Sequence, residues 1–480
     1  MGEVWTQQFP HSAQKALQDA FIQRSLRRLS HFHEARAHAL AEIGLERWEA
    51  LREQGRRIKA HTIRHLDHYL EMLAQQVERH GGKVCWASTA QEANTYVLQV
   101  ARRHGARLII KSKSMVSEEM GLTQVLEAAG IETVETDLGE YIIQLAGERP
   151  FHIIAPAIHK SKEEVSDLFV RRLGAERVSD IPALAGIARR VLRQKFIQAD
   201  IGITGVNFAV AETGTIVLVT NEGNGRMCTS MPRVHIAIMG MEKVIPRWED
   251  LAVFIALLTR AATGQRISSY VTFVTGPRRA DEEDGPEEFH LVILDNGRSR
   301  MLEDPELQEA LFCIRCGACL NACPVYGKVG GHAYGWVYPG PIGSIVTPML
   351  VGLPKAKDLP NASSLCGACR EVCPLRINIP HMLLALRQRL SEGPPTERKV
   401  NLLEKALMRG WLFLVEHPWA FTWAGRVGSL LQRPLVRGGH IPWLPPPLNG
   451  WTRSRDFPPV AHRSFRLRWK ALAQGKGGRP

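Results

Sequence analysis

Apolar residues recur at helical spacing over residues 13–80, and this stretch ends at Gly81 and Gly82. That spacing places the apolar side chains on one face of a helix, and glycine commonly follows the C-terminus of a helix. The pattern therefore predicts a helical N-terminal lead-in over residues 1–82.

Short β-rich runs alternate with helical segments over residues 83–297. The first five runs read KVCWAS, RLIIKS, IETVETD, FHIIAP and IGITG. Residues 207–219, NFAVAETGTIVLV, predict a hairpin of two strands, and a helix over residues 248–263 lies between the run VHIAIMG and the last runs, SYVTFVTG and EFHLVILDNG. Alternation of this kind is typical of an α/β domain whose sheet carries helices on both faces.

The chain changes character after residue 297. Residues 298–395 are rich in cysteine and framed by helical segments, and they contain an insert rich in Gly and Pro, KVGGHAYGWVYPGPIGSIVTPMLVGLP. Residues 396–480 form a tail rich in Trp and Pro. Its apolar runs, such as GWLFLVEHPWAFTWAG, are short and interrupted by polar residues, so no transmembrane segment is predicted.

The cysteines follow the spacing of proteins that bind two 4Fe-4S clusters. One run, CIRCGACLNACP, is complete, and a second, CGACREVCP, repeats it without the first cysteine. In two-cluster ferredoxins the cysteine before Pro binds the cluster of the other run. Zinc is the main alternative, but an unbroken run of four cysteines followed by Pro fits a cluster better. Crossed binding predicts one fully cysteine-ligated cluster held by Cys313, Cys316, Cys319 and Cys373, and a second cluster held by Cys323, Cys366 and Cys369.

The second cluster lacks one cysteine, because Ser363 stands three residues before Cys366 where the repeat requires a thiol. Three answers are open. Ser363 supplies an alkoxide, the open iron binds water or a group from a partner, or the site holds a three-iron cluster. An open iron invites Lewis-acid chemistry, but we favour a vacant corner that takes no part in a reaction.

The usage of cysteine also bears on the compartment. Seven of the nine cysteines lie within 61 residues at metal-binding spacings, unlike the spread of a secreted disulfide scaffold. We therefore expect a reducing compartment, the cytoplasm.

The basic balance of the chain raises the question of a nucleic-acid partner. The formal net charge is +13, but the basic residues are dispersed over amphipathic helices, and no nucleic-acid recognition motif is present. Anionic clusters also offset part of the excess charge. We expect no nucleic-acid partner, and a cluster protein that binds RNA or DNA is only the third hypothesis.

Several strings resemble the lactate-utilisation protein B family, the iron-sulfur subunits of a bacterial L-lactate oxidation system. The resemblance covers nearly the whole chain. It implies an α/β domain similar to the glucosamine-phosphate isomerase and coenzyme A transferase class, followed by an α-helical two-cluster ferredoxin domain. In that family the seven-cysteine pattern is usual. The strings are KSKSMVSEEMGL, ETDLGEYIIQL, APAIHK, GITGVNFAVAETGTIVLVTNEGNGR, CIRCGACLNACPVY, GGHAYGWVYPGPIG, SSLCGACREVCP and, more weakly, SFRLRW.

The resemblance also implies a function and partners. The function is electron transfer in support of the oxidation of L-lactate to pyruvate, which allows growth on lactate. The partners are two companion subunits, one rich in cysteine and one with a second α/β domain, and a downstream electron acceptor. No G-x-G-x-x-G follows a strand in the right context, so we expect hydride chemistry on another protein. The alternative is a self-contained oxidoreductase in which the α/β domain binds the substrate and the open cluster corner activates it.

Polar residues of the α/β domain gather at predicted strand ends and turns, where ligands bind in such sheets. Structural roles are the alternative, because Asn221 suits a left-handed turn position and Glu222 with Arg226 suits an ion pair. The pattern predicts a site for a small anion or a nucleotide, and it assigns no catalytic residue. The candidate ligand-binding residues are Lys111, Lys113, Ser114, Glu212, Thr213, Asn221, Glu222, Asn224 and Arg226.

Overall fold

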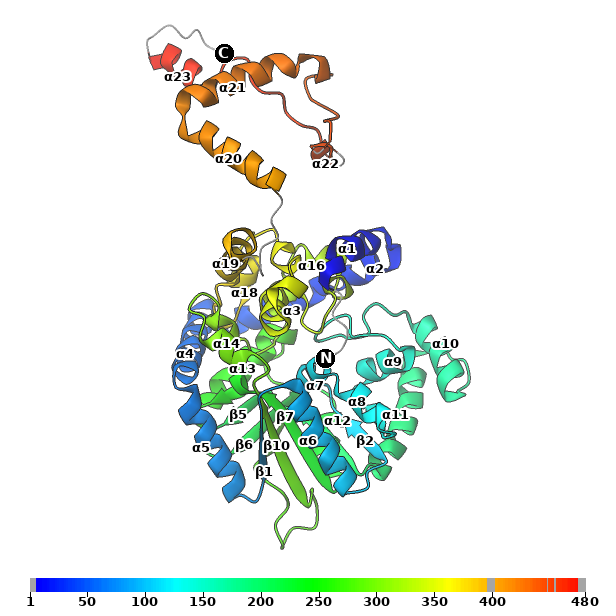
Figure 1. Ribbon diagram of the computed structural model, residues 1–480. Helices are drawn as coiled ribbons and strands as arrows, with labels where there is room; N and C mark the ends of the chain where they lie inside the picture. Colours follow the sequence, from blue (N-terminus) through cyan, green and yellow to red (C-terminus); the bar gives the residue numbers. More distant parts are fainter. Residues whose placement is uncertain (1–5, 395–401, 447, 453–454, 474–480) are drawn as a thin grey trace. The chain divides into compact units, whose positions relative to one another are not determined.

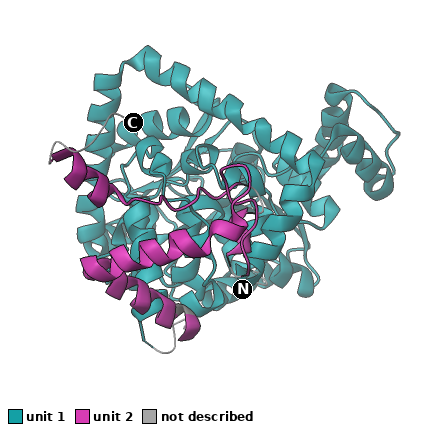
Figure 2. Ribbon diagram, turned by 90° about the horizontal axis from the view of Figure 1, so that it is seen from above, with its two compact units in different colours: residues 1–398 teal, residues 399–480 magenta. Residues whose placement is uncertain are grey.

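The computed structural model of the chain describes residues 6–394, 402–446, 448–452 and 455–473 (Figure 1). The chain divides into two compact units, residues 1–398 and residues 399–480 (Figure 2). The first three predicted domains fall within the first unit. The predicted boundary between residues 395 and 396 lies outside the described residues.

Five helices form the N-terminal lead-in, which confirms the prediction from the periodicity. Helix α5 ends at Arg79, and Gly81 follows with a φ of 85°, a left-handed conformation that glycine adopts without strain. Asp19 caps α2, because its carboxylate accepts the backbone N–H groups of Phe21 and Ile22. The helices are α1 (Phe9–Gln18), α2 (Ala20–Arg27), α3 (Leu29–Ile43), α4 (Leu45–Arg64) and α5 (Leu66–Arg79).

A parallel sheet of six strands forms the centre of the α/β region. Its strand order is β1-β10-β7-β4-β2-β3. The central strand, VHIAIMG, is buried along its whole length, which explains its almost continuous apolar sequence. The strands are β1 (Lys83–Ala87), β2 (Leu108–Lys111), β3 (Glu132–Glu135), β4 (Ile201–Gly205), β7 (Val234–Gly240) and β10 (Glu288–Leu294).

Helices cover both faces of this sheet, as predicted. Neighbouring residues of β2 point to opposite faces, so that Ile109 packs in one apolar cluster with Val97 of α6, and Ile110 packs in another with Phe169 of α10. A capping box at Ser161 and Glu164 begins α10. The helices are α6 (Ala90–Arg103), α7 (Met115–Met120), α8 (Leu122–Ala128), α9 (Leu138–Ala146), α10 (Lys162–Leu173) and α11 (Ile181–Gln198).

The predicted hairpin is confirmed, but it belongs to a second sheet. Strand β5 pairs antiparallel with β6, with Phe208 opposite Val217. The second sheet has the order β8-β5-β6-β9. Its strands are β5 (Phe208–Val210), β6 (Thr215–Thr220), β8 (Val244–Ile245) and β9 (Tyr270–Val274), and helices α12 (Asn224–Ser230) and α13 (Asp250–Thr263) follow β6 and β8.

One predicted strand, FHIIAP at residues 151–156, is wrong. This segment forms a turn in which the N–H of Phe151 donates to the carbonyl of Pro156 at 2.9 Å. The carbonyl of Phe151 accepts the hydroxyl of Tyr326 at 2.9 Å, and the Phe151 ring lies 4.9 Å from the ring of His332 between centroids. The apolar run therefore packs against the cysteine-rich region and not within a sheet.

Short helices and turns make up the cysteine-rich region, and its Gly- and Pro-rich insert is ordered. Tyr334 and Tyr338 of the insert are at most 1% exposed, and the insert also forms helix α17. The helices of this region are α14 (Arg298–Leu302), α15 (Ala318–Asn321), α16 (Tyr326–Val329), α17 (Gly340–Val351), α18 (Ala368–Val372) and α19 (Ile379–Glu392).

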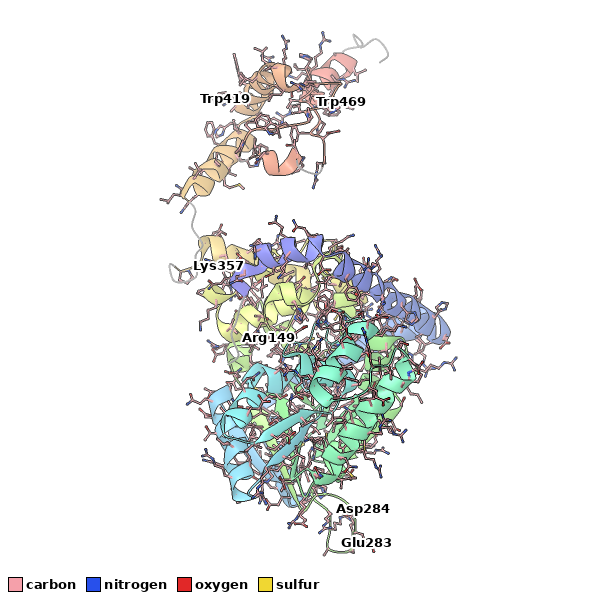
Figure 3. The ribbon with its side chains drawn as sticks, turned by 90° about the vertical axis from the view of Figure 1, so that its right-hand side faces the viewer. Arg149, Glu283, Asp284, Lys357, Trp419 and Trp469 are labelled. Carbon is pink, nitrogen blue, oxygen red and sulfur yellow. The ribbon has the colours of Figure 1, made fainter. Side chains whose placement is uncertain are left out.

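The second unit exposes many large apolar side chains. Trp419 is 64% exposed and Trp469 is 60% exposed (Figure 3). Over the described residues, no helix is long and apolar enough to cross a membrane. The helices of this unit are α20 (Leu402–Glu416), α21 (Pro418–Leu431), α22 (Asn449–Thr452) and α23 (Phe465–Ala473).

A buried guanidinium joins the α/β region to the cysteine-rich region. Arg298 is 1% exposed, and it donates from Nη2 to Glu119 at 2.8 Å and from Nε to Glu242 at 2.6 Å. The hydroxyl of Tyr338 also donates to Glu119, at 2.6 Å, and Lys59 of α4 donates to the carbonyl of Glu242. The lead-in, the α/β region and the insert therefore meet at one buried ionic network.

Replacing Arg298 by Met should lower the free energy of unfolding by about 3–5 kcal/mol, because two buried carboxylates lose their partner. Denaturant unfolding of the anaerobically purified protein measures the change. Arg233→Met is the control, since the Arg233 side chain is 80% exposed, and it should stay within about 0.5 kcal/mol of the wild type. Equal losses in the two variants would mean that the network does not hold the regions together.

Candidate metal centre and the adjoining cavity

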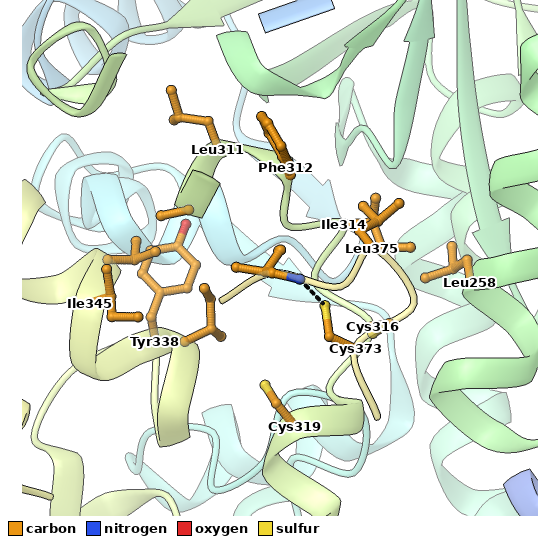
Figure 4. Close-up of a cluster of buried hydrophobic side chains, with 14 of the residues drawn as sticks. Leu258, Leu311, Phe312, Ile314, Cys316, Cys319, Tyr338, Ile345, Cys373 and Leu375 are labelled. Carbon is orange, nitrogen blue, oxygen red and sulfur yellow. Dashed lines mark hydrogen bonds between the residues drawn. The ribbon is translucent and has the colours of Figure 1, made fainter. Parts of the chain in front are cut away.

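Four of the seven motif cysteines line one cavity. Three of them come from the first run, and the fourth comes from the second run, which is the arrangement expected from crossed binding. Apolar side chains such as Ile314 and Leu375 close the wall, and Figure 4 shows both among the buried residues around the thiols. The four cysteines are Cys313, Cys316, Cys319 and Cys373.

The chemistry of this donor set fits an iron-sulfur cluster. Burial raises the pKa of the Cys373 thiol to about 11, so the thiolate that binds iron needs a bound cation. Backbone N–H groups point at the sulfurs, since Arg315 donates to Cys313 and Ile377 donates to Cys373, both at 3.4 Å. Hydrogen bonds of this kind tune cluster potentials. In the described part of the chain, no three His, Cys, Asp or Glu side chains are gathered tightly enough to hold a single ion.

The other three cysteines, Cys323, Cys366 and Cys369, form a second group, in which Cys323 and Cys369 are buried and Cys366 reaches the surface. Burial raises the pKa of Cys369 to about 12, and the neighbouring thiolates of Cys323 and Cys366 add to the rise. The Cys366 side chain is exposed. Helix α15, which carries Cys319, contacts helix α18, which carries Cys369 of this second group. Burial also raises the pKa of Cys319, and the Cys369 thiolate adds to the rise. The two groups of cysteines are therefore neighbours.

Ser363 takes the same place in the second run as Cys313 takes in the first. The residue two positions later has a positive φ in both, 60° at Arg315 and 55° at Leu365. The N–H of Leu365 donates to Ser363 Oγ at 3.1 Å, as the N–H of Arg315 donates to Cys313 Sγ at 3.4 Å. The two loops therefore share one conformation, with an oxygen in place of the sulfur.

Helix α4 of the lead-in holds the loop that carries Cys373. Arg52 donates to the Cys373 carbonyl from Nε at 3.0 Å and from Nη2 at 2.8 Å. Arg376, three residues later, forms ion pairs with Glu53 at 2.8 Å and Glu49 at 2.5 Å. Sequence reasoning missed these residues, because they lie on an ordinary amphipathic helix without a motif.

A larger cavity, of about 260 Å³, lies at the carboxyl ends of the parallel strands. Segments that follow β2, β3, β4 and β7 supply Lys113, Asp137, Asn207 and Lys243 to its wall. Ligands bind at this edge of α/β sheets. Cys316 belongs to the same wall, so the cavity extends from the α/β region to the first group of cysteines.

Five of the nine candidate residues of the α/β region line this cavity. Lys113 donates from Nζ to the Ile154 carbonyl at 3.1 Å, and Ser114 caps α7. The buried amide oxygen of Asn224 has no hydrogen-bond partner among the described residues. The five are Lys113, Ser114, Asn221, Glu222 and Asn224.

The other four candidates lie outside the residues that line the cavity. Lys111 is buried, and its Nζ lies 2.5 Å from Glu135 in an ion pair. Glu212 accepts a backbone N–H at the start of α13, and Thr213 bonds a neighbouring threonine. Arg226 is exposed, and its guanidinium lies over an aromatic ring, that of Tyr270, instead of pairing with Glu222.

Two cations on the cavity wall escaped sequence reasoning. Lys243 is 7% exposed, and burial lowers its pKa to about 8. Arg315 lies 4.6 Å from the ring centroid of Tyr338, and its buried Nη1 has no hydrogen-bond partner among the described residues. The string GMEKV around Lys243 carries no motif, and its position just past a central strand is the signal that was available.

Three segments of the chain match known families. Residues 70–294 match the LUD domain, residues 309–377 match the 4Fe-4S dicluster domain, and residues 388–474 match the C-terminal part of lactate utilisation protein B. The dicluster match favours iron-sulfur clusters over the zinc alternative.

Similar proteins cover nearly the whole chain. Lactate utilization protein B of Oceanobacillus iheyensis is 46% identical over 445 residues, which are 93% of this chain and 92% of that protein. The protein of the same name from Bacillus licheniformis is 44% identical over 477 residues, 99% of each chain. A crystal structure of a DUF162 family protein from Deinococcus radiodurans aligns with 48% of this chain and 98% of its own, at 14% identity and a TM-score of 0.27.

Replacing Cys373 by Ala should remove the cluster of the first run, although Cys373 belongs to the second run, because the four thiols line one cavity and a methyl group cannot donate to iron. Iron and sulfide analysis should show a loss of about half of the bound iron. Electron paramagnetic resonance should show that the remaining signal is the one lost in Cys366→Ala.

Cys85→Ala provides the control, since Cys85 lies in β1 and outside both groups, and it should keep all the iron. Loss of only the cluster held by Cys323, Cys366 and Cys369 in Cys373→Ala would contradict crossed binding.

Proposed function

Because this chain belongs to the lactate utilization protein B family, we propose that it is the iron-sulfur electron-transfer subunit of a complex that oxidises L-lactate to pyruvate. One observation carries the proposal. The two groups of cysteines are neighbours, and one of them lines the α/β cavity while the other has an exposed member. Such an arrangement suits transfer of electrons between a buried site and the protein surface.

The proposal includes two 4Fe-4S clusters, which accept and release single electrons when bound. Four thiols would hold the inner cluster, and three thiols would hold the outer one. The dicluster match and the cavity lined by the first four thiols support this assignment. The inner ligands are Cys313, Cys316, Cys319 and Cys373, and the outer ligands are Cys323, Cys366 and Cys369.

The positions of the cysteines support an order for the two clusters. Cys316 lines the α/β cavity, whereas the side chain of Cys366 is exposed. The neighbours Cys319 and Cys369 connect the two groups. Electrons from a donor at the cavity would therefore pass the inner cluster first and leave from the outer cluster.

The remaining parts of the proposal concern partners and surroundings. Oxidation of lactate releases two electrons and two protons, and we assign the hydride chemistry to companion subunits, one rich in cysteine and one with a second α/β domain. A downstream acceptor takes the electrons. The requirement for reduced thiols supports the cytoplasm as the compartment. We also propose that the fold of the α/β region is similar to the glucosamine-phosphate isomerase and coenzyme A transferase class.

The position of the cavity bears on the alternative of a self-contained oxidoreductase. Among the described cysteines, Cys316 lines the cavity and the three of the outer group do not. A substrate in the cavity would thus face the inner, complete cluster. The outer cluster, whose fourth corner has no cysteine, would be held by residues that do not line this cavity, which favours the electron-transfer subunit.

L-lactate should reduce the clusters of this protein only when the companion subunits are present. The measurement is the visible absorbance and the paramagnetic signal of the anaerobic, cluster-loaded protein, with and without the companions. D-lactate serves as the control substrate. Reduction of the isolated chain by L-lactate at the rate of the full complex would contradict the proposal and establish the self-contained enzyme.

A further inference from the structure

Two positive charges lie on the wall of the α/β cavity beside the inner cysteine group. Lys243 and Arg315 both line the cavity together with Cys316. Among the described residues, the Lys243 ammonium forms no hydrogen bond and no ion pair. Arg315 has one buried nitrogen, Nη1, without a hydrogen-bond partner. The two cations are therefore only partly satisfied by the protein, and buried cations are costly unless an anion neutralises them.

The neighbouring carboxylate of Glu242 satisfies these cations only in part. One of its oxygens, Oε1, pairs with Arg315 Nη2 at 3.5 Å, and the other, Oε2, binds Arg298 at 2.6 Å. Two more carboxylates line the cavity, Asp137 after β3 and Glu222 after β6, together with the cation Lys113. Besides burial, Asp137 and Lys113 are among the charges that shift the pKa of Glu222, whereas neither carboxylate is among the main charges that act on Lys243 and Arg315. Lys243 and Arg315 therefore form a positive part of the cavity wall.

The rest of the wall suits a small organic acid. The amide oxygen of Asn224 is buried and unpartnered, so it is able to accept a hydrogen bond from a hydroxyl group. Apolar side chains, including Ile153 and Leu258, line the same space. The volume of about 260 Å³ lies just below the usual range of drug-sized pockets, which suits a small acid.

We propose that this cavity binds a small carboxylate of the 2-hydroxy or 2-oxo acid class, with its carboxylate group held by Lys243 and Arg315 beside Cys316. The choice of a carboxylate over another small anion rests on the proposed function. The site gives the α/β region a ligand, and it places that ligand at the inner cluster.

Lys243→Met removes the charge and keeps the length of the side chain, so it should weaken the binding of pyruvate and L-lactate about 10- to 100-fold, as expected for loss of a hydrogen bond to a charged group. Calorimetry of the anaerobic, cluster-loaded protein measures both acids. Lys162→Met, at an exposed lysine of α10, should bind them as the wild type does. Lys243→Arg should recover part of the affinity. Lactamide, the neutral amide, should bind the wild type at least about 10-fold more weakly.

Three outcomes would overturn the proposed site. The first is that neither acid shows saturable binding to the wild type. The second is unchanged affinity in Lys243→Met, and the third is tighter binding of inorganic phosphate than of both acids. A shifted cluster potential in Lys243→Met with unchanged binding would mean that the cation serves the cluster alone. Iron content checks that each variant is folded and loaded.

The same preparations separate this proposal from the proposed function. If pyruvate binds in a Lys243-dependent manner but L-lactate does not reduce the full complex, the electron-transfer function fails and the site stands. If the complex is reduced by lactate equally well in Lys243→Met and neither acid binds the isolated chain, the site fails and the function stands.

A different observation concerns the outer cluster. Ser363 Oγ is held by the N–H of Leu365 in the same loop conformation that holds Cys313 Sγ. From this match we infer that Ser363 is the fourth protein ligand of the outer cluster, through an alkoxide oxygen. The inference replaces the vacant corner that the sequence alone favoured.

Ser363→Ala should change the Mössbauer and paramagnetic signals of the outer cluster, because a methyl group cannot donate to iron. Ser364→Ala is the matched control at the next residue, which is exposed, and it should leave both signals unchanged. Ser363→Cys should retain the outer cluster, since a thiolate at this loop position has the placement of Cys313. Unchanged signals in Ser363→Ala, or loss of the cluster in Ser363→Cys, would overturn the inference.

Discussion

The buried guanidinium of Arg298 has to be neutralised inside the protein, and the groups that neutralise it fix how the two halves of the first unit meet. Glu119 comes from α7 and Glu242 comes from the turn after β7, so both belong to the α/β region. Arg298 itself begins the cysteine-rich region. Because a charge buried without its partner costs several kcal/mol, the two regions have little freedom to separate. The same turn carries Lys243, and Tyr338 bonds Glu119, so this network also shapes the cavity.

A second constraint acts on the cysteines. Crossed binding requires the two runs to meet, although the long insert separates them in sequence. Helix α4 contributes to this meeting, because Arg52 binds the carbonyl of Cys373 and thereby positions the loop of the second run. The lead-in is therefore a structural part of the metal centre and more than a packing element. The sequence does not reveal this role. An arginine that donates to a backbone carbonyl can bind a segment of any sequence, so no motif marks the contact.

Local patterns predicted the elements that local forces determine. The lead-in helices, the hairpin at β5 and β6, and the pairing of two cysteine runs follow from periodicity and spacing alone. The segment at Phe151 was predicted wrongly, because its apolar residues are buried by the distant Tyr326 region and not by neighbouring strands. Arg226 was a candidate because it lies in a predicted turn after a strand. In the structure it belongs to the short helix α12, and its side chain lies on the surface over the ring of Tyr270. The one local signal of Lys243 was its position just past a central strand, and its importance depends on Arg315, which lies far along the sequence.

The cavity explains why an α/β region and a ferredoxin region share one chain. The carboxyl ends of parallel strands form an open edge, and a small ligand bound there would be exposed to water without a second wall. The cysteine-rich region supplies that wall with Arg315, Cys316 and Tyr338. Neither region contains all the residues of the cavity, so the site exists only when the two are docked. Docking also places Cys316 of the inner group in the cavity wall, while Cys366 of the outer group stays exposed. The buried ionic network that closes the interface therefore also sets how the cavity and the inner cysteines lie relative to each other. Under the proposal that the cavity binds a small carboxylate, this network couples the bound ligand to the inner cluster.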